Sequence, residues 1–330
     1  MATRRWRSIA MAAVLAAVLA APVQAASVGS LKQYRVPTPT SSPLNITLGS
    51  DGNFWFTEGH VLPGGGDINH HVGRITPRGN ITEFLVCPDG CFPNDIAQGP
   101  NGILYFSKSA NALGRITTAG MVLSDIPFPD SGGSHQVDAH GDDIWFTDFN
   151  RDSLWRYAVS TEATTQFELP GVDDGRDPNP FDLAIEASGI VWFTESNTNA
   201  IGRLDPQTGV ITETPVPGSP RHIAIAADGS VWFTEIFDHA VGRLDPTTGG
   251  VTIIQLAAGT FPEDIAAAPD GSVWVTQSRT GNIAQITTAG VIAESRIIRG
   301  SEPAGITVAP NGDPWFTELA ANKIANLQLR

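Results

Sequence analysis

One aromatic phrase, Trp-Phe-Thr-Glu or a close variant of it, recurs seven times along the chain. Its first aromatic residue occupies these positions: Trp55, Tyr105, Trp145, Trp192, Trp232, Trp274 and Trp315. Consecutive copies are therefore about 40 to 50 residues apart, which is the length of one β-propeller blade. This repeat constrains the fold more than any other feature, because every copy must adopt the same supersecondary unit.

Each copy has the pattern of four short strands. In the fourth copy an apolar strand, "FDLAI", meets a turn, and "VWFTE" runs back; "IGRLD" and "VITETPVP" follow, joined by the turn "PQTG". No segment after residue 26 shows sustained helical periodicity. Sheets that are apolar on both faces must be stacked between neighbours, as blades are around a central channel. We therefore predict an all-β fold, a seven-bladed β-propeller of four-stranded blades.

The two ends of the repeat region complement each other. The last copy stops after its third strand, "KIANLQLR", whereas "LKQYRVPTP" from Leu31 reads as a fourth strand without a blade. Pairing these segments would close the ring and remove both exposed sheet edges. We predict that the N-terminal strand completes the last blade, so that residues 27–330 form a single propeller domain.

The first 26 residues have the pattern of a secretory signal peptide. Arg4, Arg5 and Arg7 precede the apolar run "IAMAAVLAAVLAA" and the small-residue stretch "PVQAA". The run is too short to span a bilayer, so we expect residues 1–26 to be removed and the mature protein to be secreted without membrane insertion. The segment "TRRWR" contains a pair of arginines but lacks the apolar residues of a twin-arginine signal, which favours the general secretory route.

Charge and cysteine content narrow the range of partners. The chain has 20 basic and 34 acidic side chains and a net charge of −14, and loss of the signal's three arginines makes this more negative. Such a surface repels nucleic acid and anionic lipid, and we expect a monomer. Cys87 and Cys91 in "CPDGC" predict a disulfide in an oxidising compartment. The alternative, a metal-binding pair, lacks the two further ligands that zinc needs.

Two charged positions recur in most copies and are therefore interpreted as scaffold. An acid ends the aromatic phrase, and an arginine occurs in the "GR" of the next strand. The acids are Glu58, Asp148, Glu195, Glu235 and Glu318; the arginines are Arg74, Arg115, Arg156, Arg203 and Arg243. Because these positions lie on adjacent strands of a hairpin, we expect them to pair across the strands.

Function is expected where the copies differ. Loops vary in length and chemistry on one face of the predicted ring, and the first strand of each blade begins on that face. Its first two residues after the entry position are the pairs Leu44 and Asn45, Asn94 and Asp95, His135 and Gln136, Phe181 and Asp182, Arg221 and His222, Glu263 and Asp264, and Ala304 and Gly305. We expect this polar ring at the channel mouth.

Two interpretations of this ring remain open. Asp95, Asp182 and Asp264 could bind a divalent metal, and His135, His222 and Asp182 could act as acid and base on a substrate. Alternatively, the aspartates bond backbone amides at the strand entry and are structural. His135 and His222 stand out because no other copy has a histidine in those slots.

The phrases "DGSVWFTE", "IGRLDPQTGVITETPVP" and "PAGITVAPNGDPWFTE" resemble the streptogramin (virginiamycin) B lyases, over essentially the whole mature chain. The resemblance implies a seven-bladed propeller that opens a cyclic depsipeptide by elimination, with Mg²⁺ supporting the developing negative charge. It also implies catalytic histidines at the second position of "PHxI" segments in two consecutive blades. Only His135 occupies such a position here, between Asn94 and Phe181.

Two functions follow as expectations. The first is a secreted carbon–oxygen lyase that opens a cyclic ester or depsipeptide, with His135 as general base and Mg²⁺ as cofactor. The second is a non-catalytic extracellular propeller that binds a peptide, glycan or cell-wall component. Both place a small-molecule or peptide ligand at the channel mouth, and the residues do not decide whether the protein is an enzyme.

Overall fold

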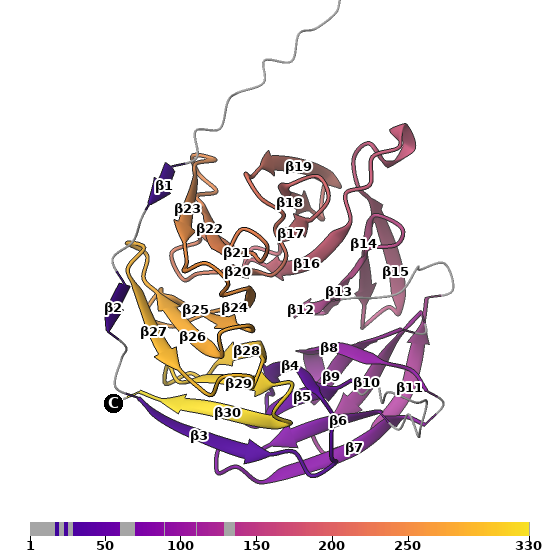
Figure 1. Ribbon diagram of the computed structural model, residues 1–330. Helices are drawn as coiled ribbons and strands as arrows, with labels where there is room; N and C mark the ends of the chain where they lie inside the picture. The colour runs from indigo at the N-terminus through magenta and orange to yellow at the C-terminus, as the bar shows by residue number, and fades with distance from the viewer. Residues whose placement is uncertain are drawn as a thin grey trace, which may run out of the picture.

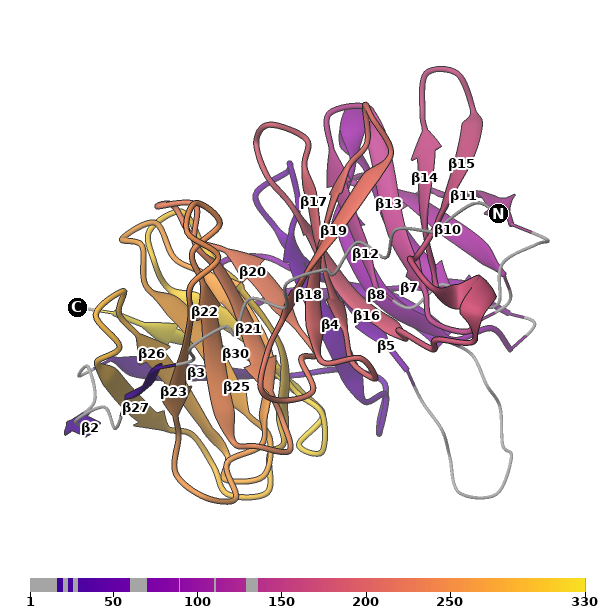
Figure 2. The ribbon, with the colours of Figure 1, turned by 90° about the horizontal axis from the view of Figure 1, so that it is seen from above.

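Seven antiparallel blades of four strands are arranged around a central axis in the computed structural model, and two of these sheets carry a fifth, parallel strand (Figure 1). The structure describes residues 17–19, 23–25, 29–59, 70–88, 90–109, 111–128 and 136–329. The predicted seven-bladed all-β propeller is confirmed. Seen from above, the strands β25–β27 and β13–β15 lie at opposite ends of the ring (Figure 2).

The blades follow one another in chain order, each from its innermost to its outermost strand. The first three are β4 (Pro43–Leu48), β5 (Phe54–Glu58), β6 (His70–Ile75) and β7 (Ile81–Cys87); β8 (Pro93–Gln98), β9 (Ile103–Lys108), β10 (Ala112–Thr117) and β11 (Val122–Pro127); and β12 (Val137–His140), β13 (Asp143–Asp148), β14 (Ser153–Ala158) and β15 (Ala163–Glu168).

The next three blades are β16 (Pro180–Ile185), β17 (Val191–Glu195), β18 (Ala200–Asp205) and β19 (Val210–Pro215); β20 (Ile223–Ile225), β21 (Val231–Glu235), β22 (Ala240–Leu244) and β23 (Val251–Gln255); and β24 (Pro262–Ala267), β25 (Val273–Gln277), β26 (Asn282–Ile286) and β27 (Ile292–Arg296). The seventh contains β28 (Pro303–Val308), β29 (Pro314–Glu318), β30 (Lys323–Gln328) and β3 (Ser30–Arg35). Two short 3-10 turns, η1 (Pro100–Gly102) and η2 (Val172–Asp174), lie in connections.

The N-terminal strand closes the ring as predicted. β3 pairs antiparallel with β30, with Tyr34 opposite Ile324. Gln33 on β3 donates hydrogen bonds of 2.8 and 2.7 Å from Nε2 to the two carboxylate oxygens of Glu318 on β29. The seventh blade thus contains both ends of the ring, and β3 takes its outermost position and covers the edge that β30 would otherwise expose.

Two short strands precede the ring. β1 (Ala17–Leu19) pairs in parallel with β23, and β2 (Val23–Ala25) pairs in parallel with β27. They lie within the segment that the sequence assigns to a signal peptide, and removal of residues 1–26 stays a prediction. Within the described part of the chain, no helix is long and apolar enough to cross a membrane.

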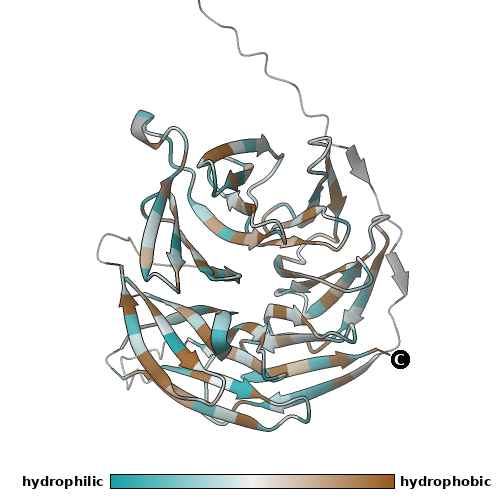
Figure 3. Cartoon of the chain, turned by 180° about the vertical axis from the view of Figure 1, so that it is seen from behind, coloured by the Kyte–Doolittle hydropathy of each residue, from teal (hydrophilic) through white to brown (hydrophobic). Residues whose placement is uncertain are grey.

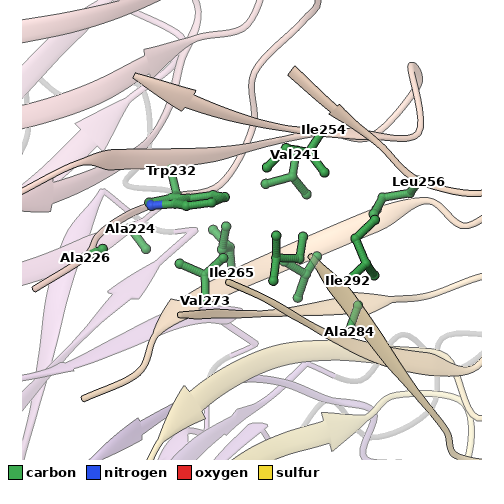
Figure 4. Close-up of a cluster of buried hydrophobic side chains, with 12 residues drawn as sticks. Ala224, Ala226, Trp232, Val241, Ile254, Leu256, Ile265, Val273, Ala284 and Ile292 are labelled. Atoms are coloured by element: carbon green, nitrogen blue, oxygen red, sulfur yellow. The ribbon is translucent and has the colours of Figure 1, made fainter. Parts of the chain in front are cut away.

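The aromatic phrase fills the space between blades. Trp232 and Phe233 are adjacent on β21 and point to opposite faces of the sheet, and both are fully buried. Apolar residues recur along the strands on all sides of the ring (Figure 3). Between the fifth and sixth blades, Trp232 and Val241 pack with Ile265 and Val273 (Figure 4). The core is therefore a series of layers between neighbouring blades.

The predicted pairing of the phrase's acid with the "GR" arginine is wrong. In the fourth blade Arg203 lies opposite Trp192, whereas Glu195 lies opposite Ala200. The guanidinium carbon of Arg203 lies 5.9 Å from the Trp192 ring centroid, a cation–π distance. The two positions belong to the same hairpin, but they are three pairs apart in its register, so the arginine covers the tryptophan.

The threonine of the phrase connects neighbouring blades at their inner ends. Thr194 donates a hydrogen bond from its hydroxyl to the carbonyl oxygen of Arg221, at 2.7 Å. Thr276 does the same to Ala304, and Thr317 to Leu44, both at 2.6 Å. Each hydroxyl thereby fixes the start of the next blade's first strand, which is where the candidate site lies.

The two cysteines form a disulfide, as the sequence predicts. Cys87 ends β7, Cys91 lies just before β8, and their Cα atoms are 5.2 Å apart. The bond therefore closes the connection between the first and second blades.

Candidate functional site

The predicted aspartates each join two neighbouring blades. Asp182 accepts the backbone N–H of Leu183 at 2.7 Å with Oδ1 and that of Ile223, in the next blade, at 3.0 Å with Oδ2. Asp264 makes the same pair of bonds with Ile265 and Ile306. These are the backbone-amide bonds that the structural interpretation expects, extended from one blade to the next.

Asp95 belongs to the same set but lies further round the ring. Its Oδ2 accepts the backbone N–H of Val137 in the third blade, at 2.8 Å. Burial raises the pKa of Asp95 well above its usual range, the amide bonds oppose this, and the charges of Asp182 and Asp264 add to it. Asp138 follows Val137 on the first strand of the third blade. Burial and the charge of Asp182 raise the pKa of Asp138 to about 7, although backbone amide bonds oppose the shift. These two side chains therefore hold protons that ordinary surface aspartates would lose.

His222 lies between two of the aspartates. Its Nδ1 is 3.3 Å from Oδ2 of Asp182 and 3.5 Å from Oδ1 of Asp264, and the side chain is 7% exposed. Burial lowers the pKa of His222, but the hydrogen bond to Asp182 and the charges of Asp264, Asp182 and Glu263 outweigh burial and raise it to about 9. In turn, burial raises the pKa of Asp264 to about 6 although His222 opposes the shift. The imidazole is thus a buried imidazolium at neutral pH, held by carboxylates from the blades on both sides.

These carboxylates do not fit a magnesium site. Mg²⁺ needs several oxygen ligands in octahedral geometry, whereas Asp182 and Asp264 already bind two backbone amides each and share the His222 cation. Among the residues that the structure describes, no three His, Cys, Asp or Glu side chains are grouped so that they could hold a metal ion.

A cavity of about 580 Å³ opens at the channel mouth, above His222 and Asp264. Its lining combines aromatic, cationic and acidic side chains: Phe181, Arg221, Phe261, Glu263, Arg279 and Glu302. A cavity of this size accommodates a small organic ligand. Below it, a space of about 190 Å³ in the channel is lined by Asp95, Asp138, Asp182 and Asp264.

Two arginine–phenylalanine stacks flank the cavity. The guanidinium carbon of Arg221 lies 3.9 Å from the Phe181 ring centroid, and that of Arg279 lies 4.6 Å from the Phe261 centroid. Stacking leaves the edge of each guanidinium free to donate hydrogen bonds in its own plane. The cavity wall can therefore contact both the apolar and the anionic groups of a ligand.

Part of this site was not predicted from the sequence. Arg279 follows the second strand of its blade, and Phe261 and Glu302 precede the proline that opens the next first strand. Phe261 and Glu302 have positive φ angles of 53° and 51°. Ser42 and Asn179, which precede the same proline in the first and fourth blades, have φ angles of 51° and 53°, so this left-handed conformation belongs to the blade entry and is strained when the residue is a phenylalanine. Both Phe261 and Glu302 come immediately before a "PxxI" segment, and a comparison of this position between the copies could have identified them.

The predicted site residues are therefore only partly brought together. Asp182, His222 and Asp264 form one contact group, whereas Asp95 contacts the third blade. His135 lies outside the described residues. Gln136, the next residue, is buried, and its Nε2 lies 3.5 Å from Nδ1 of His222.

The fold and this cavity define a class: a seven-bladed propeller with a small-ligand cavity at one mouth of its channel. The chain belongs to the virginiamycin B lyase family, whose model matches residues 23–134 and 121–330. A solved streptogramin B lyase is 26% identical, with a TM-score of 0.81, and the match covers 93% of this chain and all of that one. The family resemblance inferred from the sequence is confirmed.

Two further structures support the relationship. Virginiamycin B lyase from Staphylococcus aureus is 26% identical with a TM-score of 0.79, covering 92% of this chain and all of that one. A catalytically inactive histidine-to-alanine variant of that enzyme, solved with quinupristin, is 27% identical with the same TM-score and the same coverage. The search of curated proteins found no match.

Proposed function

We propose that this protein is an extracytoplasmic propeller that binds a small peptide-like ligand in the channel-mouth cavity, without chemically converting it. The observation that carries the proposal is the cavity itself, with its volume of about 580 Å³ and its paired aromatic and cationic side chains. Aromatic faces bind apolar side chains of a peptide, and arginine and glutamate bind its charged and amide groups.

The charge state of His222 argues against this residue as a general base. A general base must be unprotonated near the operating pH, whereas two carboxylates raise the pKa of His222 to about 9 against the effect of burial. In addition, the described second positions of the first strands are Leu44, Asn94, Phe181, Arg221, Glu263 and Ala304. None of these is a histidine, so no two consecutive blades supply the pair that the family resemblance implies.

A second candidate is a carbon–oxygen lyase that opens a cyclic ester or depsipeptide by elimination. It is favoured by membership of the virginiamycin B lyase family and by the buried imidazolium of His222 below the cavity. In this case His135 would remove the α-proton next to the ester, and the ester's carboxylate would leave. His222 could stabilise the negative charge that develops in such a reaction.

One experiment separates the two functions. Quinupristin and linear peptides of the same composition are titrated into the purified protein by calorimetry, and each mixture is then analysed by chromatography with mass detection. Binding without a new product supports the binding propeller. A product of unchanged mass but different retention identifies elimination, because ring opening by elimination gives an isomer, whereas a product one water heavier identifies hydrolysis.

A matched pair of variants locates the binding site. Phe261→Ala removes an aromatic face from the cavity, and we expect it to weaken binding by about tenfold. Val210→Ala, at a position 56% exposed on the outer strand β19, serves as the control and leaves binding unchanged. Equal affinities of both variants and the wild type would show that the ligand does not bind in this cavity.

A further inference from the structure

The side chain of Arg221 lacks the partners that a guanidinium normally has. It is partly buried, and its Nε atom is buried with no hydrogen-bond partner. Within the part of the chain that the structure describes, its guanidinium makes no hydrogen bond and no ion pair, and its one specific contact is the 3.9 Å stack on Phe181. The five N–H donors of this cation therefore have no acceptor among the described side chains.

Two other arginines bind carboxylates, whereas Arg203, which stacks on Trp192 at 5.9 Å, likewise forms no ion pair within the described residues but lines neither cavity. Arg243 stacks on Trp232 in the same way, at 5.7 Å, but it also forms an ion pair of 3.0 Å with Asp228. Arg176 is bound at 2.9 Å by Glu213. Arg221 thus combines a stack with partial burial but has no carboxylate in contact, although the protein carries an excess of acidic side chains.

The position of Arg221 is that of a binding residue. It lines the channel-mouth cavity and also an adjoining pocket of about 250 Å³. Polar side chains of Asn179, Ser196, Asn197 and Ser219 line that smaller pocket, together with Phe149, Phe181 and Phe237. An anionic group placed between the two spaces would reach the guanidinium edge and neutral donors, and among the described residues it would meet no acidic side chain in the smaller pocket.

Burial makes this cation costly without an anion. It lowers the pKa of Arg221 below its usual range, and the charge of Glu263 opposes the shift without forming a contact ion pair. A bound carboxylate would compensate for the lost hydration through two parallel charge-assisted hydrogen bonds. A planar carboxylate suits this geometry better than a neutral amide, which offers one acceptor oxygen and places an N–H group against the guanidinium.

We propose that the ligand of the cavity carries a free carboxylate, such as a peptide C-terminus, and that Arg221 binds this group at the junction of the cavity and the adjoining pocket. The inference rests on the proposed binding function and specifies the ligand class. It makes Arg221 the residue that distinguishes an acid from the corresponding amide.

The test uses two small probes that differ only in charge, N-acetyl-L-phenylalanine and its carboxamide. Ligand-observed NMR titration measures the affinity of each for the wild type, for Arg221→Gln and for Arg221→Lys. Arg243→Gln is the control, because it removes a stacked arginine that lies outside the cavity lining. The Nε–H signal of Arg221, assigned by its loss in Arg221→Lys, reports contact with the acid directly.

We expect the acid to bind the wild type about tenfold or more tightly than the amide, which is the usual effect of a hydrogen bond to a charged group. Arg221→Gln should abolish this preference, Arg221→Lys should keep part of it, and Arg243→Gln should keep all of it. Equal binding of acid and amide to the wild type overturns the inference while leaving the proposed binding function intact. Failure of the acid to bind the wild type up to its solubility limit also overturns the inference. If Arg221→Gln does not fold, the acid–amide comparison on the wild type and on Arg221→Lys still decides.

Discussion

Nδ1 of His222 lies 3.3 Å from Oδ2 of Asp182, and the same oxygen accepts the backbone N–H of Ile223 at 3.0 Å. One carboxylate thus binds both the side chain and the main chain of the next blade. Asp264 contacts His222 from the other side, at 3.5 Å. The fourth, fifth and sixth blades are therefore joined at their inner ends through one imidazolium.

This arrangement predicts a pH dependence of stability. The folded-state pKa of His222 is about 9, because Asp182 and Asp264 outweigh burial, against about 6.5 in the unfolded chain. Its stabilising contribution is therefore complete below about pH 6.5 and is lost as the pH rises through about 9. The difference in the free energy of unfolding between wild type and His222→Gln should shrink by about 3 kcal/mol over this range. Urea denaturation of both proteins at several pH values measures it, and parallel pH profiles would contradict the assigned ion pair.

Two of the aspartates should respond differently to replacement by asparagine. Asp95 is held protonated by burial, so Asp95→Asn preserves its charge state, whereas Asp264, with a pKa of about 6, is ionised at pH 7.5 beside His222. Because removal of one member of a buried ion pair costs about 3 kcal/mol or more, Asp264→Asn should be the more destabilising variant at pH 7.5. The gap should narrow at pH 5, where Asp264 is itself protonated. Thermal melts of both variants at the two pH values test this, and a gap that is the same at both would contradict it.

The fold could be predicted from the sequence because its signals are local and repeated. Seven tryptophan or tyrosine positions give the number of blades. The strand-like segment from Leu31, which belongs to no copy of the repeat, indicated how the ring closes. The arginine–acid pairing failed for a local reason as well: residue spacing identifies the hairpin, but the register places Arg203 opposite Trp192. Neighbouring strands can be recognised from a pattern, whereas the partner within them depends on the turn that joins them.

The site could be predicted only as far as the ring positions that the repeat defines. Asp182 and His222 lie at the mouth as expected, but their partners are backbone amides and carboxylates of the next blade, which no pattern within one repeat reveals. Phe261 and Arg279 belong to loops that differ from copy to copy, so an alignment of the repeats does not identify them as site residues. Their contribution becomes visible only when the ring brings the loops of several blades together.

Gly305 should be required for contact between the last blade and the first. A Cβ atom at this position would lie 2.5 Å from the carbonyl oxygen of Leu44 and 2.6 Å from the Cα of Asn45. Because both neighbours are backbone atoms, Gly305→Ala must move β28 away from β4, at a cost of about 1 to 3 kcal/mol. Gly250→Ala, whose Cβ would meet a Thr248 hydroxyl oxygen 3.2 Å away, is the control. Equal melting temperatures of the two variants would show that the closing interface tolerates a methyl group.

Divalent metal should have no effect on stability. Asp182 and Asp264 are already bound to backbone amides and to His222, and the raised pKa of Asp95 keeps that side chain protonated. Thermal melts with millimolar Mg²⁺ and with chelator should therefore coincide. A ligand that binds only the folded state raises stability in proportion to its occupancy, so a reproducible upward shift with Mg²⁺ would assign a metal site that these carboxylates do not explain.

Phe261 should serve binding at some expense of stability. Its φ of 53° lies in the left-handed region, which costs a residue of this kind about 1 to 2 kcal/mol. Its ring contacts Arg279 at 4.6 Å and His239 at 4.9 Å, and it lines the cavity.

Phe261→Asn exchanges the ring for a side chain that adopts this conformation readily. Relief of strain should offset the lost contacts, so the free energy of unfolding should stay within about 1 kcal/mol of the wild type. Ligand affinity should fall about tenfold, because an aromatic face of the cavity is lost. Denaturation and calorimetry on the same samples measure the two effects, with Met121→Asn, at a site 60% exposed in the turn between β10 and β11, as a control that alters neither. Unchanged affinity in Phe261→Asn would show that the Phe261 ring does not contact the ligand.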